Sequence, residues 1–267
     1  MKYLRVVSGS TSPGGDYGVL RDEKISLLSS SPLNGGARET GVSFGVEEVD
    51  VYLPPVIPPN IIALGLNYAG HAKESSMEQP DEPVIFLKAT TALTGHLQPI
   101  VLPSAHPDEV DYEAELAVVI GKKAKNIGED EAPDYIFGYT CGNDVSARDC
   151  QMTYDRQWAR AKSFDTFAPL GPWIETDLDP SNLRISARLN GKTVQEAGTG
   201  GLIFKIPRLI SFLSRQMTLL PGTVVMTGTP PGVGYGKTPP VYLRPGDTVQ
   251  IDIEGIGILE NPVAREV

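Results

Sequence analysis

Thiol and imidazole ligands are scarce in this sequence. Its 267 residues include only two Cys and three His, which is too few for a zinc ribbon, a disulfide scaffold or a histidine-rich metal cage. Any metal must therefore be held by oxygen atoms. No apolar run approaches the roughly 20 residues that a membrane-spanning helix needs. The opening MKYLRVVSGSTSPGG lacks the apolar region of a signal peptide, so we expect a soluble, cytoplasmic protein with no membrane partner.

Basic residues are also fewer than acidic ones. The chain has 23 Lys and Arg against 33 Asp and Glu, a formal net charge of −10, which disfavours nucleic acid as a partner because like charges repel. Gly and Pro are abundant, at 28 and 23 residues, and follow no repeat. This composition excludes collagen and favours a β-rich fold with many tight turns.

The chain divides at a proline-rich segment. Residues 53–60, LPPVIPPN, hold four prolines in eight positions, which favours a stiff extended connector. Before it, short β-like segments at 3–7, 17–20, 42–44 and 49–53 alternate with Gly, Ser and Asp. We therefore predict a small N-terminal domain over residues 1–55 and a main domain over 56–267.

The main domain is predicted to be dominated by strands with a few helices. Asn190-Gly191 between strand-like flanks indicates a hairpin. Apolar residues at i, i+3, i+4 and i+7 predict a helix from Ile206 to Leu213. Ser146 and Asp149 suggest an N-terminal cap for a second helix over 146–160. Further strands are predicted at 61–64, 84–87, 112–120, 137–142 and around 249–253.

Acidic residues alternate along the segment DYEAELAVVIGKK. In a strand, Asp111, Glu113 and Glu115 would share one face, while the apolar residues between them would form the other. Two carboxylates at this spacing can converge on one cation. The alternative is an acidic strand that deters aggregation at a sheet edge.

A third carboxylate follows the predicted strand at 137–142. Asp144 could cap the next helix, or it could join Glu113 and Glu115 as a ligand. Carboxylate oxygens are the ligands that Mg²⁺, Mn²⁺ and Ca²⁺ prefer.

The segment GLNYAGHAKE contains a candidate acid–base pair. His71 and Glu74 are three residues apart, so one helical turn would place them on the same face, where the carboxylate can orient the imidazole and stabilise its charge. The glycines around them and the 75–83 segment suggest a mobile loop or lid over a site. A lone histidine with a structural role is the alternative.

The sequence resembles the fumarylacetoacetate hydrolase family from about residue 61 to the C-terminus. The N-terminal 55 residues contribute little to the resemblance. The motifs that carry it, in the family's order, are GLNYAGHAKE, PVIFLK, DYEAELAVVIGK, GNDVSARDCQ, RAKSFDTFAPLGPW, LNGKTVQ, TGTPPGVG and GDTVQIDIEGIGILENPV.

The resemblance implies an α+β, β-dominated fold, a mixed β-sandwich roll with a small N-terminal domain, usually in a homodimer. It implies a divalent cation, Mg²⁺ or Mn²⁺ with Ca²⁺ as an option, held by Glu113, Glu115 and Asp144. The other residues whose roles it implies are His71, Glu74 and Lys162 for catalysis, and Tyr68, Arg148, Gln151 and Thr229 for the substrate.

Some positions depart from the family pattern. Ala69 and Gly70 stand where many relatives have Arg and Asp, and Leu66 stands where some acylpyruvate-cleaving relatives have Arg. The segment is therefore less charged than in those relatives, and a carboxylate contact from position 66 is absent.

Our leading hypothesis from the sequence is a metal-dependent hydrolase. The substrate would be a β-diketo or 2-oxo acid of the acylpyruvate type, chelated by the cation. His71 would activate water, and C–C cleavage would release an enolate. Decarboxylation of oxaloacetate and isomerisation of a 2-hydroxydienoate are alternatives at the same site. A noncatalytic metal-binding protein is the alternative of another class.

Overall fold

The computed structural model describes residues 1–74 and 77–266. Ser75 and Ser76, which belong to the predicted lid, lie outside these residues. Within them, no helix is both long enough and apolar enough to cross a membrane.

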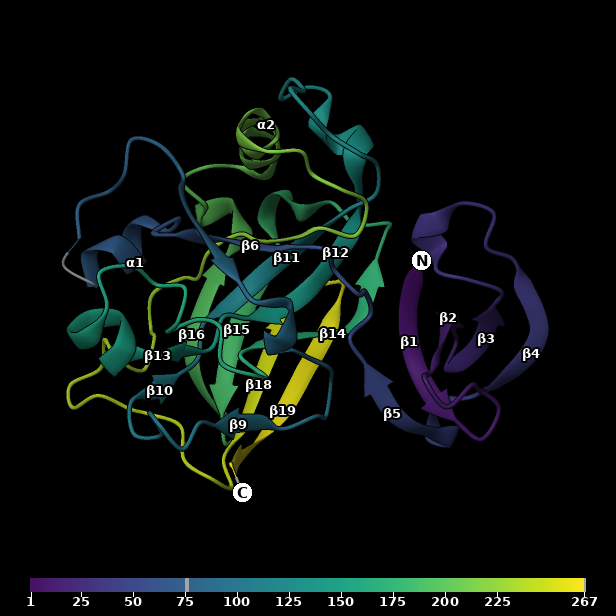
Figure 1. The fold of residues 1–267 in the computed structure, drawn as a ribbon, viewed down its shortest axis with the longest axis horizontal. Helices are drawn as coiled ribbons and strands as arrows, with labels where there is room; N and C mark the ends of the chain where they lie inside the picture. Colours follow the sequence, from purple (N-terminus) through teal and green to yellow (C-terminus); the bar gives the residue numbers. More distant parts are fainter. Residues whose placement is uncertain (75–76, 267) are drawn as a thin grey trace.

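Strands dominate the architecture, as predicted (Figure 1). A twelve-stranded sheet has the order β4-β3-β2-β1-β14-β12-β11-β17-β6-β7, with β5 paired to β1 and β8 paired to β14. A five-stranded sheet, β16-β15-β18-β19-β9, contacts it through β11, β12 and β14. Both sheets are mixed, because β17/β6, β14/β8 and β19/β9 are parallel pairs among antiparallel ones. This confirms the predicted fold class.

The strands are β1 (Lys2–Ser8), β2 (Asp16–Arg21), β3 (Lys24–Leu28), β4 (Glu39–Gly45), β5 (Val49–Leu53), β6 (Ile61–Gly65), β7 (Val84–Lys88), β8 (Leu93–Thr94), β9 (Ile100–Leu102), β10 (Val110–Asp111), β11 (Ala114–Ile120), β12 (Ile136–Asn143), β13 (Ser146–Ala147), β14 (Ala168–Glu175), β15 (Arg184–Leu189), β16 (Lys192–Gly198), β17 (Val224–Met226), β18 (Thr248–Ile253) and β19 (Gly257–Arg265). The helices are α1 (Ala69–Glu74) and α2 (Ile206–Gln216). The short turns are six 3₁₀ segments, η1 (Pro32–Asn34), η2 (Val46–Glu48), η3 (Thr90–Ala92), η4 (Ala132–Tyr135), η6 (Pro180–Asn182) and η7 (Thr199–Gly201), and one π-helical turn, η5 (Cys150–Tyr154).

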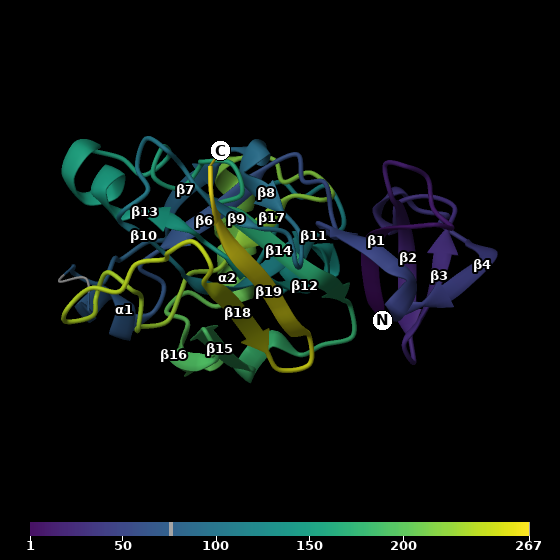
Figure 2. The same cartoon turned by 90° about the horizontal axis from the view of Figure 1, so that it is seen from below.

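The N-terminal strands β1–β4 lie at one end of the molecule, and α1 lies at the other (Figures 1 and 2). These strands have a small apolar cluster of their own, which includes Leu4, Ile25 and Phe44. They are also joined to the main body, because β1 pairs with β14 at Lys2 and Tyr3. The domain boundary near residue 55 stays a prediction.

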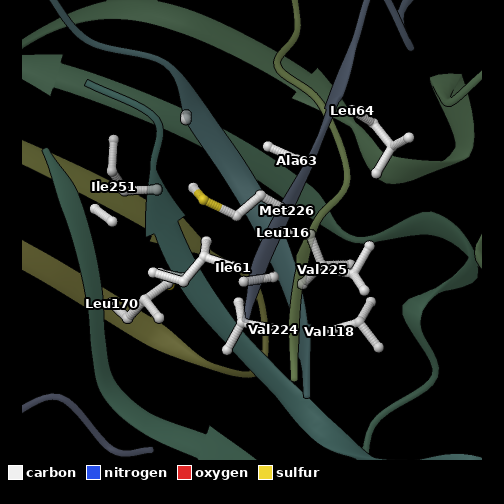
Figure 3. Packing of buried hydrophobic residues seen from close by; sticks show 14 of the residues in the cluster. Ile61, Ala63, Leu64, Leu116, Val118, Leu170, Val224, Val225, Met226 and Ile251 are labelled. Carbon is white, nitrogen blue, oxygen red and sulfur yellow. The ribbon is translucent and has the colours of Figure 1, made fainter. Parts of the chain in front are cut away.

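The large core is built on the central strands β11, β17 and β6 (Figure 3). Every residue of β11 is buried, on both faces. β11 is thus a central strand and not an acidic strand at a sheet edge. Glu113 and Glu115 still share one side, as predicted, because their carboxylate oxygens lie within 4.8 Å of each other. Glu115 is buried within the strand, and Glu113 precedes it. The strand also begins later than predicted, at Ala114, because the Glu113 N–H donates to the Asn143 side chain instead of to a neighbouring strand.

Two local predictions were confirmed. Asn190 and Gly191, with φ of 51° and 77°, form the tight turn between β15 and β16. Both central residues of such a turn need positive φ, which Asn and Gly adopt at low cost. The helix predicted from Ile206 is α2, and it buries Ile206, Leu209, Ile210 and Leu213.

The helix predicted over 146–160 is present only in part, at residues 148–154. Ser146 and Ala147 form β13, which pairs with β10, and Ser146 donates its hydroxyl proton to the Asp144 carbonyl instead of capping a helix. Within the predicted range only residues 148–154 are helical, and from Cys150 to Tyr154 the helix is the π-helical turn η5, where the Asp149 side chain accepts the Cys150 N–H at 2.7 Å. Strand pairing at 146–147 thus replaces the first helical turn.

Candidate active site

Strand register brings three carboxylates together. β11 and β12 are antiparallel with Ala114 opposite Asn143, so Glu113, just before β11, faces Asp144, just after β12. The Asp144 N–H donates to the Glu113 carbonyl at 2.9 Å, which fixes this pairing. Carboxylate oxygens of Glu113, Glu115 and Asp144 lie within 4.8 Å of one another. Asp144 therefore does not cap a helix but faces the two glutamates.

These carboxylates suit a hard divalent cation. All three residues are at least 96% buried, and within the described residues Glu115 has no cationic partner, only the Gly228 N–H at 2.8 Å. Burial and the charges of Asp144 and Glu113 raise the pKa of Glu115 well above its usual value. An oxygen-only set of buried acids is what Mg²⁺ or Mn²⁺ prefers, so the residues present fit such an ion.

Two buried lysines contact the carboxylates. Lys162 donates to Glu113 at 2.8 Å and to Asp144 at 2.7 Å. Lys88, the last residue of β7, donates to the other Asp144 oxygen. Burial alone raises the pKa of Glu113, but Lys162 and Arg148 outweigh it and hold the pKa below its usual range. Glu113 is thus kept ionised, as a metal ligand must be.

Arg148 connects the cluster to a fourth acid. Its Nε donates to Asp111 at 2.6 Å and its Nη2 to Glu113 at 2.7 Å, while Nη1 donates to Gln151 at 2.7 Å. Asp111 also accepts the Tyr235 N–H at 2.8 Å. The guanidinium therefore holds Glu113 and Gln151 in position through two of its three nitrogens, and the third binds Asp111.

The pair His71 and Glu74 lies on α1, as the spacing predicted. The imidazole Nδ1 is 3.6 Å from Glu74 Oε2, beyond direct hydrogen-bond distance. Both Glu74 oxygens accept the Gly232 N–H, at 3.1 and 3.0 Å. The carboxylate is thus fixed beside the imidazole by the loop that follows Thr229.

A cavity of about 460 Å³, including the part open to solvent, lies between α1 and the carboxylates. The predicted site residues that line it are His71, Glu113, Arg148, Gln151, Lys162 and Thr229. Glu74, Glu115 and Asp144 do not line the cavity. Glu74 is the neighbour of His71, and Asp144 binds Lys162, so these two contact lining residues.

Two of the predicted substrate residues are tied into the scaffold. Thr229 accepts a hydrogen bond from the Gln195 side chain at 2.8 Å, which orients its hydroxyl. Tyr68 is buried, forms a β-bridge with Leu202, and is not among the lining residues. The structure therefore brings Thr229, but not Tyr68, to the cavity surface.

Several residues of the site were not predicted as such. Lys88 ends an apolar strand, where a buried lysine signals a charged partner. Gln195 fixes Thr229 and also accepts the Ala114 N–H at 2.9 Å. Trp158 and Phe86 line the cavity with rings 5.4 Å apart. No spacing rule indicates the last three residues, because each reaches the site only through the tertiary fold.

Related proteins match this sequence over most of its length. Residues 60–264 match the family described as fumarylacetoacetate (FAA) hydrolase C-terminal. The chain is 46% identical over 216 residues to the mitochondrial oxaloacetate tautomerase of Rattus norvegicus, covering 79% of this chain and 69% of that protein.

Solved structures of related proteins have the same fold as this chain. The 5-carboxymethyl-2-hydroxymuconate delta-isomerase of Mycobacterium smegmatis has a TM-score of 0.88 and 43% identity, with 100% of both chains covered. The 2-hydroxyhepta-2,4-diene-1,7-dioate isomerase of Mycobacterium marinum has a TM-score of 0.87 and 40% identity, covering 100% of this chain and 99% of that one. The chain belongs to the fumarylacetoacetate hydrolase family.

Proposed function

We propose that the chain is a divalent-metal-dependent isomerase of 2-oxo acids, which moves a proton between carbon and oxygen to interconvert keto and enol forms. This replaces C–C hydrolysis, our leading hypothesis from the sequence, with its isomerase alternative. The substrate partner is a small 2-oxo acid. Homodimerisation and a cytoplasmic location stay predictions.

The observation that carries the proposal is the position of His71. Its buried imidazole lines the same cavity as Glu113 and Lys162, with the Glu74 carboxylate 3.6 Å away. An imidazole beside a fixed carboxylate can act as a general base and then return the proton. An isomerase needs only this proton transfer, without a positioned water.

The relatives support isomerisation over hydrolysis. The rat protein is named an oxaloacetate tautomerase, and the two mycobacterial structures are named isomerases of unsaturated acids. A more distant structure, at 33% identity, is named a fumarylacetoacetate hydrolase. Proton transfer next to a 2-oxo group is the chemistry that the closer names share.

Each of the site residues has a separate role in the proposed reaction. A cation bound by Glu113, Glu115 and Asp144 would supply Lewis-acid stabilisation of negative charge on the substrate's oxygens. His71 moves the proton at the carbon next to the 2-oxo group, and Glu74 stabilises the imidazolium that results. Lys162 balances the charge of Glu113 and of the substrate carboxylate, and Thr229 donates a hydrogen bond to that carboxylate.

The test follows the ultraviolet absorption of enol-oxaloacetate in the presence of Mg²⁺. We expect the protein to accelerate loss of the enol, and we expect His71→Gln to slow the reaction by about 100-fold, the scale of general acid–base catalysis. His96→Gln is the matched control, because His96 lies outside the cavity lining and accepts only the Glu260 N–H.

Product analysis separates the alternatives in the same reaction. Pyruvate and CO₂ from oxaloacetate would indicate a decarboxylase, and pyruvate from an acylpyruvate would indicate a hydrolase. Metal binding without turnover of any of these compounds would indicate a noncatalytic protein. Each of these results contradicts the proposed isomerase.

A further inference from the structure

A second group of side chains that can bind a metal meets at the start of η5, outside the carboxylate cluster of the candidate active site. One ring nitrogen of His106, one carboxylate oxygen of Asp149 and the Sγ of Cys150 all lie within 4.8 Å of one another. His106 belongs to the loop between β9 and β10, whereas Asp149 and Cys150 are consecutive residues at the N-terminal end of η5. The tertiary fold therefore brings nitrogen, oxygen and sulfur donors together from positions 43 residues apart.

Contacts within and around this group hold the donors in place. His106 Nδ1 is 2.6 Å from Asp149 Oδ2, and the other carboxylate oxygen accepts the Cys150 N–H at 2.7 Å. The imidazole packs against the rings of Tyr154 and Phe164, with ring centroids 5.6 and 6.0 Å away. The donors are thus preorganised, which lowers the ordering cost of binding an ion.

The group is accessible to solvent on the side of its nitrogen and oxygen donors. The side chains of His106 and Asp149 are each 19% exposed, whereas Cys150 is fully buried. A metal site needs an entry path as well as suitable ligands. Two of the three donor residues provide that path, and they leave room for a water ligand.

The thiol is poorly suited to covalent catalysis, although a histidine and a carboxylate lie beside it. Burial, and then the charge of Asp149, raise the pKa of Cys150 to about 11, so the thiol is protonated at neutral pH and is a weak nucleophile. A divalent cation replaces that proton: the S–H bond breaks, a bond between sulfur and the metal forms, and the proton passes to solvent. The same three residues can therefore hold a metal ion.

We propose that His106, Asp149 and Cys150 form a second metal site, which binds a borderline divalent ion of the Zn²⁺ class. Zn²⁺ accepts nitrogen, oxygen and sulfur ligands with water in a fourth position, whereas Mg²⁺ prefers the all-oxygen carboxylate cluster. The two sites therefore select ions by donor chemistry. This site is an exception to the expectation from composition that any metal is held by oxygen alone, and it does not depend on the proposed function.

The position of this second site links it to the cavity. Its ligands Asp149 and Cys150 are flanked in sequence by Arg148 and Gln151, which both line the cavity and bind each other at 2.7 Å. A bound ion would connect this segment to the loop that carries His106. It would therefore hold two lining residues in place from outside the cavity.

Co²⁺ is the probe that tests the second site. A thiolate bound to Co²⁺ gives a charge-transfer band in the near ultraviolet, whereas oxygen ligands give no such band. With excess Mg²⁺ present to occupy the carboxylate cluster, we expect Co²⁺ to produce this band at one ion per chain, and we expect Zn²⁺ to remove it by displacement. Absence of the band overturns the proposal.

Variants of the two cysteines locate the ion. Cys150→Ser should abolish the band. Cys141→Ser is the matched control and should keep it, because Cys141 is the other cysteine of the chain, and its Sγ donates to the Gly257 carbonyl in another part of the fold. Glu115→Gln should also keep the band, since it changes only the carboxylate cluster. A band that survives in Cys150→Ser, or that is lost in Cys141→Ser, overturns the proposal.

A histidine variant tests the site independently of the buried thiol. His106→Gln changes a partly exposed side chain, so it remains informative even where Cys150→Ser does not fold. We expect it to weaken Zn²⁺ binding, measured by competition with Co²⁺, at least about tenfold, since loss of even a supporting partner of a metal ligand costs that much. His96→Gln, which removes a histidine elsewhere, should leave the affinity unchanged. Equal affinities of the parent and His106→Gln overturn the proposal.

Discussion

The carboxylate of Glu74 is held by the backbone N–H of Gly232. Both oxygens of the α1 carboxylate accept the same backbone N–H, at 3.1 and 3.0 Å, so the helix that carries His71 is fixed to the loop after Thr229. Glu74→Gln keeps the size of the side chain but removes its charge. We expect kcat for enol-oxaloacetate to fall by about 10- to 100-fold with little change in KM, because the charge stabilises the imidazolium and not the bound substrate.

Glu78→Gln is the control for that experiment, because Glu78 is exposed and near α1 in sequence. It should retain the parent kcat. A Glu74→Gln variant with unchanged kcat would show that the carboxylate only anchors the helix.

Glu74 should also give a pH-dependent contribution to stability. Burial raises its pKa, but His71, the Gly232 N–H and Lys237 outweigh this effect and bring the pKa below the ordinary value of 4.5. Folding therefore favours the ionised form. Its contribution to the free energy of unfolding is present above the unfolded pKa and is lost as pH falls through the lower folded pKa. Urea unfolding should show the parent losing its advantage over Glu74→Gln below about pH 4.5. A pH-independent difference would contradict this sign.

The metal site can be tested without turnover. A bound ion stabilises the folded state by about 2.7 kcal/mol at 100 times its dissociation constant, so Mg²⁺ or Mn²⁺ should raise Tm in thermal unfolding. Glu115→Gln should abolish this rise, since Glu115 lacks a cationic partner among the described residues. Glu129→Gln, at the surface, should leave it intact. An equal rise in both variants would place the ion elsewhere.

Sequence patterns identified the residues of the site more accurately than the position of the strand that carries them. Glu113 and Glu115 were found by their alternation, and their carboxylate oxygens do converge, within 4.8 Å of each other and of Asp144. The alternation could not show that β11 is a central strand buried on both faces, because its pairing with β12 and β17 is set by the tertiary structure. Three carboxylates amid apolar neighbours need a charge partner wherever the chain places them.

Predictions from backbone preference and hydrophobic periodicity were accurate where interactions between residues close in sequence determine the structure. The Asn190-Gly191 turn and helix α2 follow from backbone preference and periodicity. Strand β14 was not predicted, because APLGPW contains two prolines and a glycine that disfavour a central strand. The first turn of the helix predicted at 146–160 was lost to the pairing of β13 with β10, a contact set by tertiary structure.

The buried pair of Asp111 and Arg148 should contribute strongly to stability. Their side chains are 0% and 5% exposed, and Nε donates to Asp111 at 2.6 Å. Asp111→Asn leaves a buried guanidinium with one charge partner fewer, so we expect a loss of about 3 kcal/mol in the free energy of unfolding by urea. Glu129→Gln breaks the exposed pair with Arg208 and should cost less than about 1 kcal/mol. Similar losses in both variants would show that the buried network adds no more than a surface pair.

The contact between the Phe86 and Trp158 rings, which both line the cavity, depends on the absence of a side chain at Gly65. A Cβ there would overlap the six-membered ring of Trp158, so Gly65→Ala must displace the ring from Phe86. We expect a shift in tryptophan emission, with Trp158 one of only two tryptophans, and a loss of roughly tenfold in kcat/KM for enol-oxaloacetate, since the displaced ring changes the lining of the cavity. Gly14→Ala, where a Cβ meets nothing within 4 Å, should change neither. If Gly65→Ala keeps the parent emission and kinetics, the position of the Trp158 ring does not affect the reaction.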